Sequence, residues 1–378
     1  MPFILLFLSV VSFTYAQENN TLINISMNQI SGELDQLLPF LIDSQKFSDS
    51  KNEKEVKGHL SKLVELFKGI KKHPVISSTG FSLSRDQIET QLQETSDAFS
   101  SNHKDFARHK LNSTLGLCIS CHTQMPSGDK LKLFKNIDVE KNITSTFEKG
   151  EFYFITREFP KAMENYDRYI NQFSAKDDRK VLETVLNHKL TYFTRIQRQK
   201  ADLAVKSFEE NMLNKELPET IKIQIKAWIK DLKKKVMKAD GKEITETEMK
   251  KYLSQVTKNN EDGPRISLYS NKEAMDLKIS GILFEYLNNN PQSKLVPEIL
   301  YNLAVIDKRM NFNIFYSMGD LYLKECMDKY PDAPIAKFCY QEYEDEKILS
   351  YTGSAGTSLP SDVKKELENY RSKLKIKP

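Results

Sequence analysis

The sequence predicts an all-α protein in which an N-terminal four-helix bundle precedes an α-solenoid of helix hairpins. Apolar residues recur at spacings of three and four along most of the chain, which places them on one face of a helix. The 378 residues are 29% charged and include only 13 Gly and 13 Pro, which disfavours a β-fold with many tight turns. Helix-length segments of similar pattern recur in the last two-thirds of the chain, which is typical of helical repeats.

The first segment has the pattern of a secretory signal. An apolar run over residues 3–13 leads to small residues that end at Ala16, and the run is too short to span a bilayer. We therefore expect a signal peptide over residues 1–16 and a soluble protein exported to a bacterial periplasm. Later stretches are not apolar enough for a membrane span, and a net charge of +4 with interspersed signs gives no indication of nucleic-acid binding.

Four amphipathic segments fill residues 17–128, and each is apolar on one face only. Such helices with short connections are most readily buried as an antiparallel bundle. Ser84 and Gln87 resemble a capping box at the start of the third segment. The stripes run over residues 23–41, 56–70, 88–99 and 106–122, and Leu111, Leu115, Cys118 and His122 share the last one.

The sequence Cys118-Ile-Ser-Cys121-His122 lies near the end of the fourth segment. Thiol exchange needs the first Cys at a helix N-terminus, where the dipole lowers the pKa of the thiol. A zinc site needs a second pair of ligands, which is not present at a suitable spacing. Two thiols one helical turn apart can instead bind the two vinyl groups of one porphyrin, with the following His as proximal iron ligand. We expect one covalently attached haem c.

The segment "DFARHKLNSTLGLCISCHTQ" on the last helix of a bundle resembles cytochrome c-prime and its soluble b-type relatives. The resemblance covers residues 17–128, which we take as the haem domain. It implies a four-helix bundle with the haem-binding His near the end of the fourth helix, and either a Met ligand or an apolar blocker early in the first.

The sixth coordination position of the iron has three candidate occupants. Met27 lies on the stripe early in the first helix, which an up-down-up-down bundle places beside the end of the fourth. His73 lies at the same end, after the second stripe. The position can also be open. A His/Met iron suits one-electron transfer, whereas an open iron suits binding of a gas such as nitric oxide.

Residues 129–378 are predicted to form degenerate helical repeats. Ala162 and Tyr166 recur as Ala204 and Phe208, and the segments around Pro291 and Pro331 align with each other at a fixed period. The segment "GDLYLKECMDKYPDAPIA" resembles tetratricopeptide repeats, whereas the register is lost over residues 214–265. Such arrays present a concave surface that typically binds a protein or peptide.

Cys326 and Cys339 need a separate explanation. They are about equally far from a turn centred near Asp332 and Ala333, so an antiparallel hairpin places them side by side. Because an exported protein meets an oxidising environment, we expect a disulfide between them.

The sequence thus favours a periplasmic mono-haem c-type cytochrome that transfers single electrons and docks to a redox partner through its repeat domain. An enzyme would need a further haem or a distal acid or base, and there is no second attachment motif. Two alternatives stay open. One is a haem-based gas sensor or carrier, and the other is a haem-free scaffold in which Cys118 and Cys121 form a local disulfide.

Overall fold

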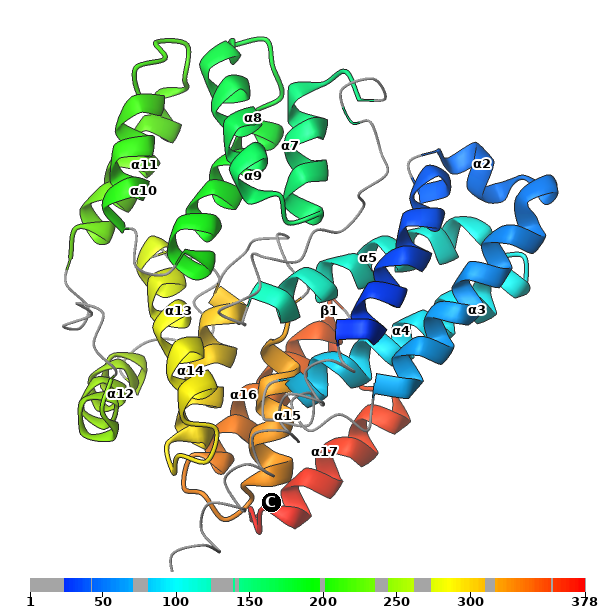
Figure 1. The fold of residues 1–378 in the computed structure, drawn as a ribbon. Coiled ribbons are helices and arrows are strands. Elements are labelled where there is room, and N and C mark those ends of the chain that lie inside the picture. The colour runs from blue at the N-terminus through cyan, green and yellow to red at the C-terminus, as the bar shows by residue number, and fades with distance from the viewer. Residues whose placement is uncertain are drawn as a thin grey trace, which may run out of the picture. The chain divides into compact units, whose positions relative to one another are not determined.

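The computed structural model describes residues 24–41, 43–70, 81–123, 139, 143–197, 201–234, 244–261, 273–309, 317–354 and 356–377 (Figure 1). The regular secondary structure of these residues is helical apart from one short two-stranded hairpin, so the prediction of an all-α chain is confirmed. No helix in this part of the chain is both long enough and apolar enough to cross a membrane. The expected signal peptide and His73 lie outside the described residues.

The chain divides into two compact units. The first comprises Met1–Cys121, Lys130–Thr144 and Phe152–Glu158, and the second comprises His122–Asp129, Ser145–Glu151 and Phe159–Pro378. Each unit is described by itself below.

The helices of the first unit follow the four predicted stripes. Asp43 caps the short helix between the first two, because its carboxylate accepts from the backbone N–H groups of Gln45 and Lys46. These elements are a helix over residues 24–41, α2 (Ser44–Ser48), the 3₁₀ turn η1 (Ser50–Asn52), α3 (Glu53–Ile70), α4 (Phe81–Ser100) and α5 (Lys104–Thr123).

Two details of the predicted stripes are wrong. Helix α4 begins at Phe81, so Ser84 lies inside the helix and fully buried rather than at the N-cap. Phe106 is 56% exposed, and its ring lies 5.5 Å from the ammonium of Lys110. The buried positions of α5 are instead Ala107, Leu111, Thr114, Leu115 and Leu117. Of the predicted stripe, Leu111 and Leu115 are buried, Cys118 is half-buried, and Phe106 is not part of the buried face.

At one end of the first unit, α2 and the end of α4 lie together with the starts of α3 and α5. The rings of Phe47 and Phe99 meet edge to face with centroids 5.3 Å apart, which joins α2 to the end of α4. Lys104 at the start of α5 forms an ion pair with Glu53 at the start of α3, with 2.9 Å between nitrogen and oxygen. Helices α3 and α5 therefore begin at the end where α4 finishes.

The second unit consists of helices that pack mainly against their neighbours in sequence. Helix α9 continues directly into a π-helical turn, η4, and α8 lies beside α9 (Figure 1). These elements are α7 (Thr146–Ile155), whose first half alone belongs to this unit, α8 (Phe159–Gln172), α9 (Arg179–Thr191), η4 (Tyr192–Ile196), α10 (Ala201–Asn211), α11 (Glu219–Leu232), α12 (Glu246–Glu261), α13 (Glu273–Asn289), α14 (Val296–Arg309), α15 (Gly319–Lys329), α16 (Ala336–Ser350), β1 (Thr352–Gly353), β2 (Gly356–Thr357) and α17 (Ser361–Lys373).

The period predicted from Pro291 and Pro331 appears as a repeated turn. Between α13 and α14, the backbone N–H of Ser293 donates to Asn290 O at 3.1 Å and that of Val296 to Ser293 O at 3.2 Å. Between α15 and α16, the N–H groups at the equivalent positions, Ala333 and Ala336, make the same two bonds at 3.0 and 2.9 Å. The two hairpins share one turn geometry.

Candidate haem-attachment site

Helix α5 carries the whole Cys118–His122 motif. The helix continues unbroken to Thr123, so the two Cys positions are separated by about one turn and His122 follows on the same helix. This is the backbone arrangement that two-point attachment to a porphyrin needs. Of the three side chains in the motif, the structure describes that of Cys118.

Cys118 is a half-buried free thiol. Burial raises the pKa of this thiol to about 12, so it is protonated at neutral pH. A protonated, shielded thiol is a poor partner for thiol exchange or for a metal ion, which both use the thiolate. It can still add its S–H bond across a vinyl group. The raised pKa of Cys118 therefore disfavours a redox-active dithiol.

The face of α4 that packs against α5 is buried, and the start of α4 lies near the end of α5 that carries the motif. Gln91 and Thr114 are both buried, and the Thr114 hydroxyl donates to Gln91 Oε1 at 3.0 Å. Lys110 also forms an ion pair with Glu94, so α4 and α5 run antiparallel. In this register the buried residues Ser84 and Ile88 of α4 lie level with the last two turns of α5. One wall of a haem pocket would therefore come from the start of α4.

The first helix runs antiparallel to α3 and α5. Glu33 lies 2.6 Å from His59 Nδ1 and accepts from Lys62 Nζ at 3.0 Å, both on α3. Near the start of α5, Arg108 donates from Nε and Nη2 to the carbonyl oxygen of Leu41, at 2.9 and 2.7 Å. The end of the first helix is thus fixed beside the start of α5.

Positions can be counted along the first helix and along α5 from the contact between Leu41 and Arg108. Met27 lies as many positions before Leu41 as His122 lies after Arg108. The interval corresponds to about 21 Å of helix in both cases. Met27 is half-buried, and Ile30 one turn later is buried.

The described histidines of the first unit lie away from the end of α5 that carries Cys118. His59 is bound to Glu33, and His103 and His109 are exposed near the start of α5. His73, the second candidate for the distal position, lies outside the described residues. Within the described part of the chain, no group of three His, Cys, Asp or Glu side chains could hold a bare metal ion.

Cys326 on α15 and Cys339 on α16 form the predicted pair. Both are fully buried, their sulfurs are at bonding distance and their Cα atoms are 6.6 Å apart. The turn between the helices lies over residues 331–335, as expected from its centre near Asp332 and Ala333.

A buried polar cluster joins α7, α8 and α9, and the sequence reasoning missed it. The Tyr166 hydroxyl donates to Glu151 Oε1 at 2.5 Å, and His188 Nδ1 lies 2.8 Å from both of those oxygens. The ring of Tyr166 packs on Gly150, where an added Cβ would be 2.6 Å from two ring carbons. Two polar residues, His188 and Lys189, interrupt the apolar stripe of α9, and this interruption is the signal that could have pointed to the cluster.

A second buried cluster lies where η4 meets α13, α14 and α15. The Arg195 guanidinium lies 4.6 Å from the ring centroid of Phe284. Asp307 accepts from Ser317 Oγ and from the backbone N–H groups of Met318 and Gly319, at 2.7–2.9 Å, so it caps α15 from the preceding helix. Burial raises the pKa of the Asp307 carboxyl, and the charge of Arg195 opposes that rise.

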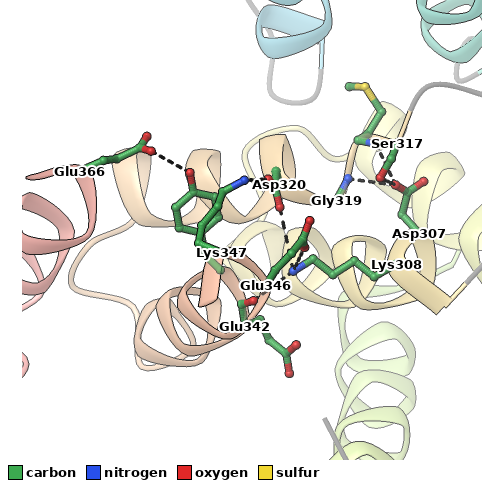
Figure 2. A network of polar contacts seen from close by, with 11 residues as sticks. Asp307, Lys308, Ser317, Gly319, Asp320, Glu342, Glu346, Lys347 and Glu366 are labelled. Atoms are coloured by element: carbon green, nitrogen blue, oxygen red, sulfur yellow. Dashed lines mark hydrogen bonds and ion pairs between the residues drawn. The ribbon is translucent and has the colours of Figure 1, made fainter. Parts of the chain in front are cut away.

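Charged side chains then connect α14 to α17, as Figure 2 shows. Asp320 forms an ion pair with Lys347, and Lys308 forms one with Glu346 while donating to Glu342 O at 3.1 Å. Burial raises the pKa of Glu346, and the neighbouring carboxylate of Asp320 raises it further. Glu366 of α17 joins through the Tyr343 hydroxyl, at 2.8 Å. These contacts fasten the last helices of the unit to one another.

Comparison with protein-family models, with curated proteins and with solved structures finds no match to this chain.

Proposed function

We propose that the chain is a mono-haem c-type cytochrome that carries single electrons, with the haem held in a four-helix bundle over residues 17–128. Cys118 and Cys121 would be the covalent anchors and His122 the proximal ligand. The observation that carries the proposal is the continuous helix α5, which sets both Cys positions and His122 on one helix at the spacing that two-point attachment requires. A bound haem supplies an iron that alternates between two oxidation states and so stores one electron.

The residues of this chain would hold and shield the group. The neutral thiol of Cys118 is suited to addition across a vinyl group, in which sulfur binds one carbon and the thiol proton goes to the other. The buried residues Leu111 and Leu115 on α5 and Ile88 on α4 keep water from one side of the site. Exclusion of water would lower the reorganisation energy of electron transfer, because fewer solvent dipoles must reorient when the charge changes.

Met27 is the distal ligand in this proposal. Its support is that Met27 lies as many positions before Leu41 as His122 lies after Arg108, whose guanidinium donates to the Leu41 carbonyl, together with the half-buried position of Met27. A thioether ligand makes the iron six-coordinate and raises its reduction potential. The ordinary role for a Met at such a place is core packing, so the ligand role needs a spectroscopic test.

The second unit would dock the cytochrome to a redox partner protein. We propose that the hairpins from α7 to α17 form an α-solenoid, supported by the turn that recurs in the last two hairpins and by packing mainly between sequence neighbours. The Cys326–Cys339 pair supports a compartment that oxidises thiols, which is also where c-type haem is carried.

The decisive experiment is the mass of the intact chain, denatured, after expression with a working cytochrome c maturation system. We expect the mass of one haem to be retained, and expect it to be lost when Cys118 and Cys121 are both replaced by Ser. His59→Gln is the matched control, because His59 is engaged by Glu33 and should not affect attachment. A wild-type chain that retains no haem would overturn the proposal and leave the haem-free scaffold.

The visible spectrum then tests the distal ligand. We expect a low-spin wild type that becomes high-spin in Met27→Ala, with Met212→Ala as a control from the second unit. A high-spin wild type that binds nitric oxide would instead support a gas sensor or carrier. A low-spin spectrum that persists in Met27→Ala and is lost in His73→Ala would assign the position to His73.

A further inference from the structure

We propose that Tyr166 is a site of proton-coupled one-electron oxidation, in which Glu151 accepts the phenol proton and His188 stabilises the phenoxyl oxygen. The oxidant is a strong one-electron acceptor, with peroxide-derived radicals as the chemical class. This activity would be separate from the haem and belongs to the second unit.

The geometry around the phenol carries the inference. Tyr166 is fully buried, and its hydroxyl donates to Glu151 Oε1 at 2.5 Å. A buried phenol that loses an electron must also lose its proton, because the cation so formed is a strong acid in a site that solvates charge poorly. A carboxylate within hydrogen-bond distance is a positioned base for that proton. Tyr166 therefore has its proton acceptor in contact before any oxidant arrives.

His188 has a complementary part in the same cluster. Its Nδ1 lies 2.8 Å from Tyr166 Oη and 2.8 Å from Glu151 Oε1. Because the phenol O–H donates to Glu151, a hydrogen on Nδ1 of His188 can donate both to Tyr166 Oη and to Glu151 Oε1. When the proton has moved to Glu151, the same N–H still donates to the phenoxyl oxygen. His188 is thus a positioning residue that holds both oxygens in place throughout the reaction.

The step balances without a further reactant. The O–H bond of Tyr166 breaks, its proton forms an O–H bond with the Glu151 carboxylate, and the electron passes to the oxidant. The products are a neutral tyrosyl radical, a neutral Glu151 and the reduced oxidant. The Glu151 side chain is 26% exposed whereas that of His188 is only 8% exposed, so the proton has a route to solvent through Glu151.

The surrounding structure holds the ring still. Gly150 lies directly against the ring of Tyr166, at a distance that leaves no room for a Cβ. The imidazole of His188 lies with its centroid 5.8 Å from that of the phenol ring. A rigid ring between a base and a hydrogen-bond donor needs little rearrangement during oxidation.

Tyr343 offers a matched control within the same unit. It is also buried and also donates to a carboxylate, with 2.8 Å to Glu366. The ammonium groups of Lys324 and Lys347 lie 5.3 and 4.9 Å from the centroid of its ring. Lys324 forms an ion pair with Glu366, the carboxylate that would accept the phenol proton, and this pairing makes Glu366 a weaker base. Tyr343 should therefore be harder to oxidise than Tyr166.

The test is flash oxidation of the full chain, in its fully oxidised form, with photogenerated tris(bipyridine)ruthenium(III), followed by electron paramagnetic resonance. We expect a neutral tyrosyl signal, of which Tyr166→Phe loses most and Tyr343→Phe loses little. In Glu151→Gln we expect the oxidation to be slowed about a hundredfold, the low end of what a positioned base contributes. Fluorescence of Trp228 in the same unit shows whether each variant is folded.

Two results would overturn the inference. One is a tyrosyl signal of unchanged size in folded Tyr166→Phe, and the other is an unchanged oxidation rate in folded Glu151→Gln. Either would leave the cluster with the structural role of fastening α7, α8 and α9 together. The inference does not use the haem, so a chain that retains no haem would still be tested by the same measurement.

Discussion

Gly150→Ala is predicted to destabilise the second unit, although Ala ordinarily favours a helix. An ideal Cβ at position 150 would lie 2.6 Å from Cδ1 and Cε1 of Tyr166. The ring has no free direction in which to move, because it is fully buried and its hydroxyl is bound to Glu151. The new methyl group must therefore either displace α7 from α8 or break the hydrogen bond to the carboxylate.

The magnitude follows from three opposing effects. Ala gains about 1 kcal/mol over Gly in a helix interior. Overpacking a dense core costs about 1–3 kcal/mol, and a lost hydrogen bond to a charged group costs about 1.5–3 kcal/mol. When the overpacking and the lost hydrogen bond both apply, the net loss in the free energy of unfolding is about 1.5–5 kcal/mol.

The assay is urea unfolding followed by the fluorescence of Trp228, which reports on the second unit because it is the only Trp of the chain. Trp228 packs on Phe208 and donates to Glu273 at 2.9 Å, so its emission changes when that unit unfolds. Gly58→Ala on α3 is the matched control, since nothing lies within 4 Å of its Cβ position. We expect Gly58→Ala to leave the Trp228 transition in place and to stabilise α3 by up to about 1 kcal/mol, measured by circular dichroism.

A double-mutant cycle isolates the contact with the ring. Tyr166→Leu removes the atoms that the new Cβ would meet, so Gly150→Ala should cost less in that background. An unchanged or increased stability of Gly150→Ala alone would refute the reasoning. So would an equal cost of Gly150→Ala in the presence and absence of the Tyr166 ring.

Two further outcomes are expected. Replacing Cys326 and Cys339 by Ala should lower the free energy of unfolding by about 3 kcal/mol, the value for a short closed loop, and reductant should shift the urea midpoint of the wild type but not of the variant. Glu346→Gln should become more stable relative to wild type as pH rises from about 4.5. The sign follows from the raised pKa of Glu346. The folded chain binds the carboxyl proton more tightly than the unfolded chain, which stabilises the folded wild type at low pH. This stabilisation is lost as the pH rises through the pKa of Glu346 in the folded chain, and Gln at this position never has it. A stability difference that stays flat with pH would show that Glu346 does not titrate in this way.

The helices and the paired turns could be predicted because their signals are local. Pro291 and Pro331 mark turns by restricting the backbone around them, and the spacing of Cys326 and Cys339 about the second turn sets them on facing helices. The placement of Met27 beside the end of the fourth helix stays a prediction, which rests on alternating helix directions with short connections.

The buried polar clusters could not be predicted because each depends on several helices at once. His188 meets Glu151 and Tyr166 from two other helices, and Asp307 on α14 caps the start of the next helix, α15. The start of α4 was misplaced for a related reason. The pattern of Ser84 and Gln87 has the right spacing for a cap, but tertiary packing extends the helix by one turn and buries Ser84 instead.

The shared turn at Asn290 and Tyr330 has a consequence for how the chain can change in length. The two hairpins repeat the same backbone bonds at equivalent positions, so one hairpin with its turn is the natural unit by which this part of the chain could lengthen or shorten. Duplication or loss of one hairpin would keep the turn geometry, but it would also require new partners for the contacts between hairpins, such as the Asp307 cap on α15 and the ion pair of Lys308 with Glu346. Insertions of other lengths would have to be absorbed by the connections between hairpins.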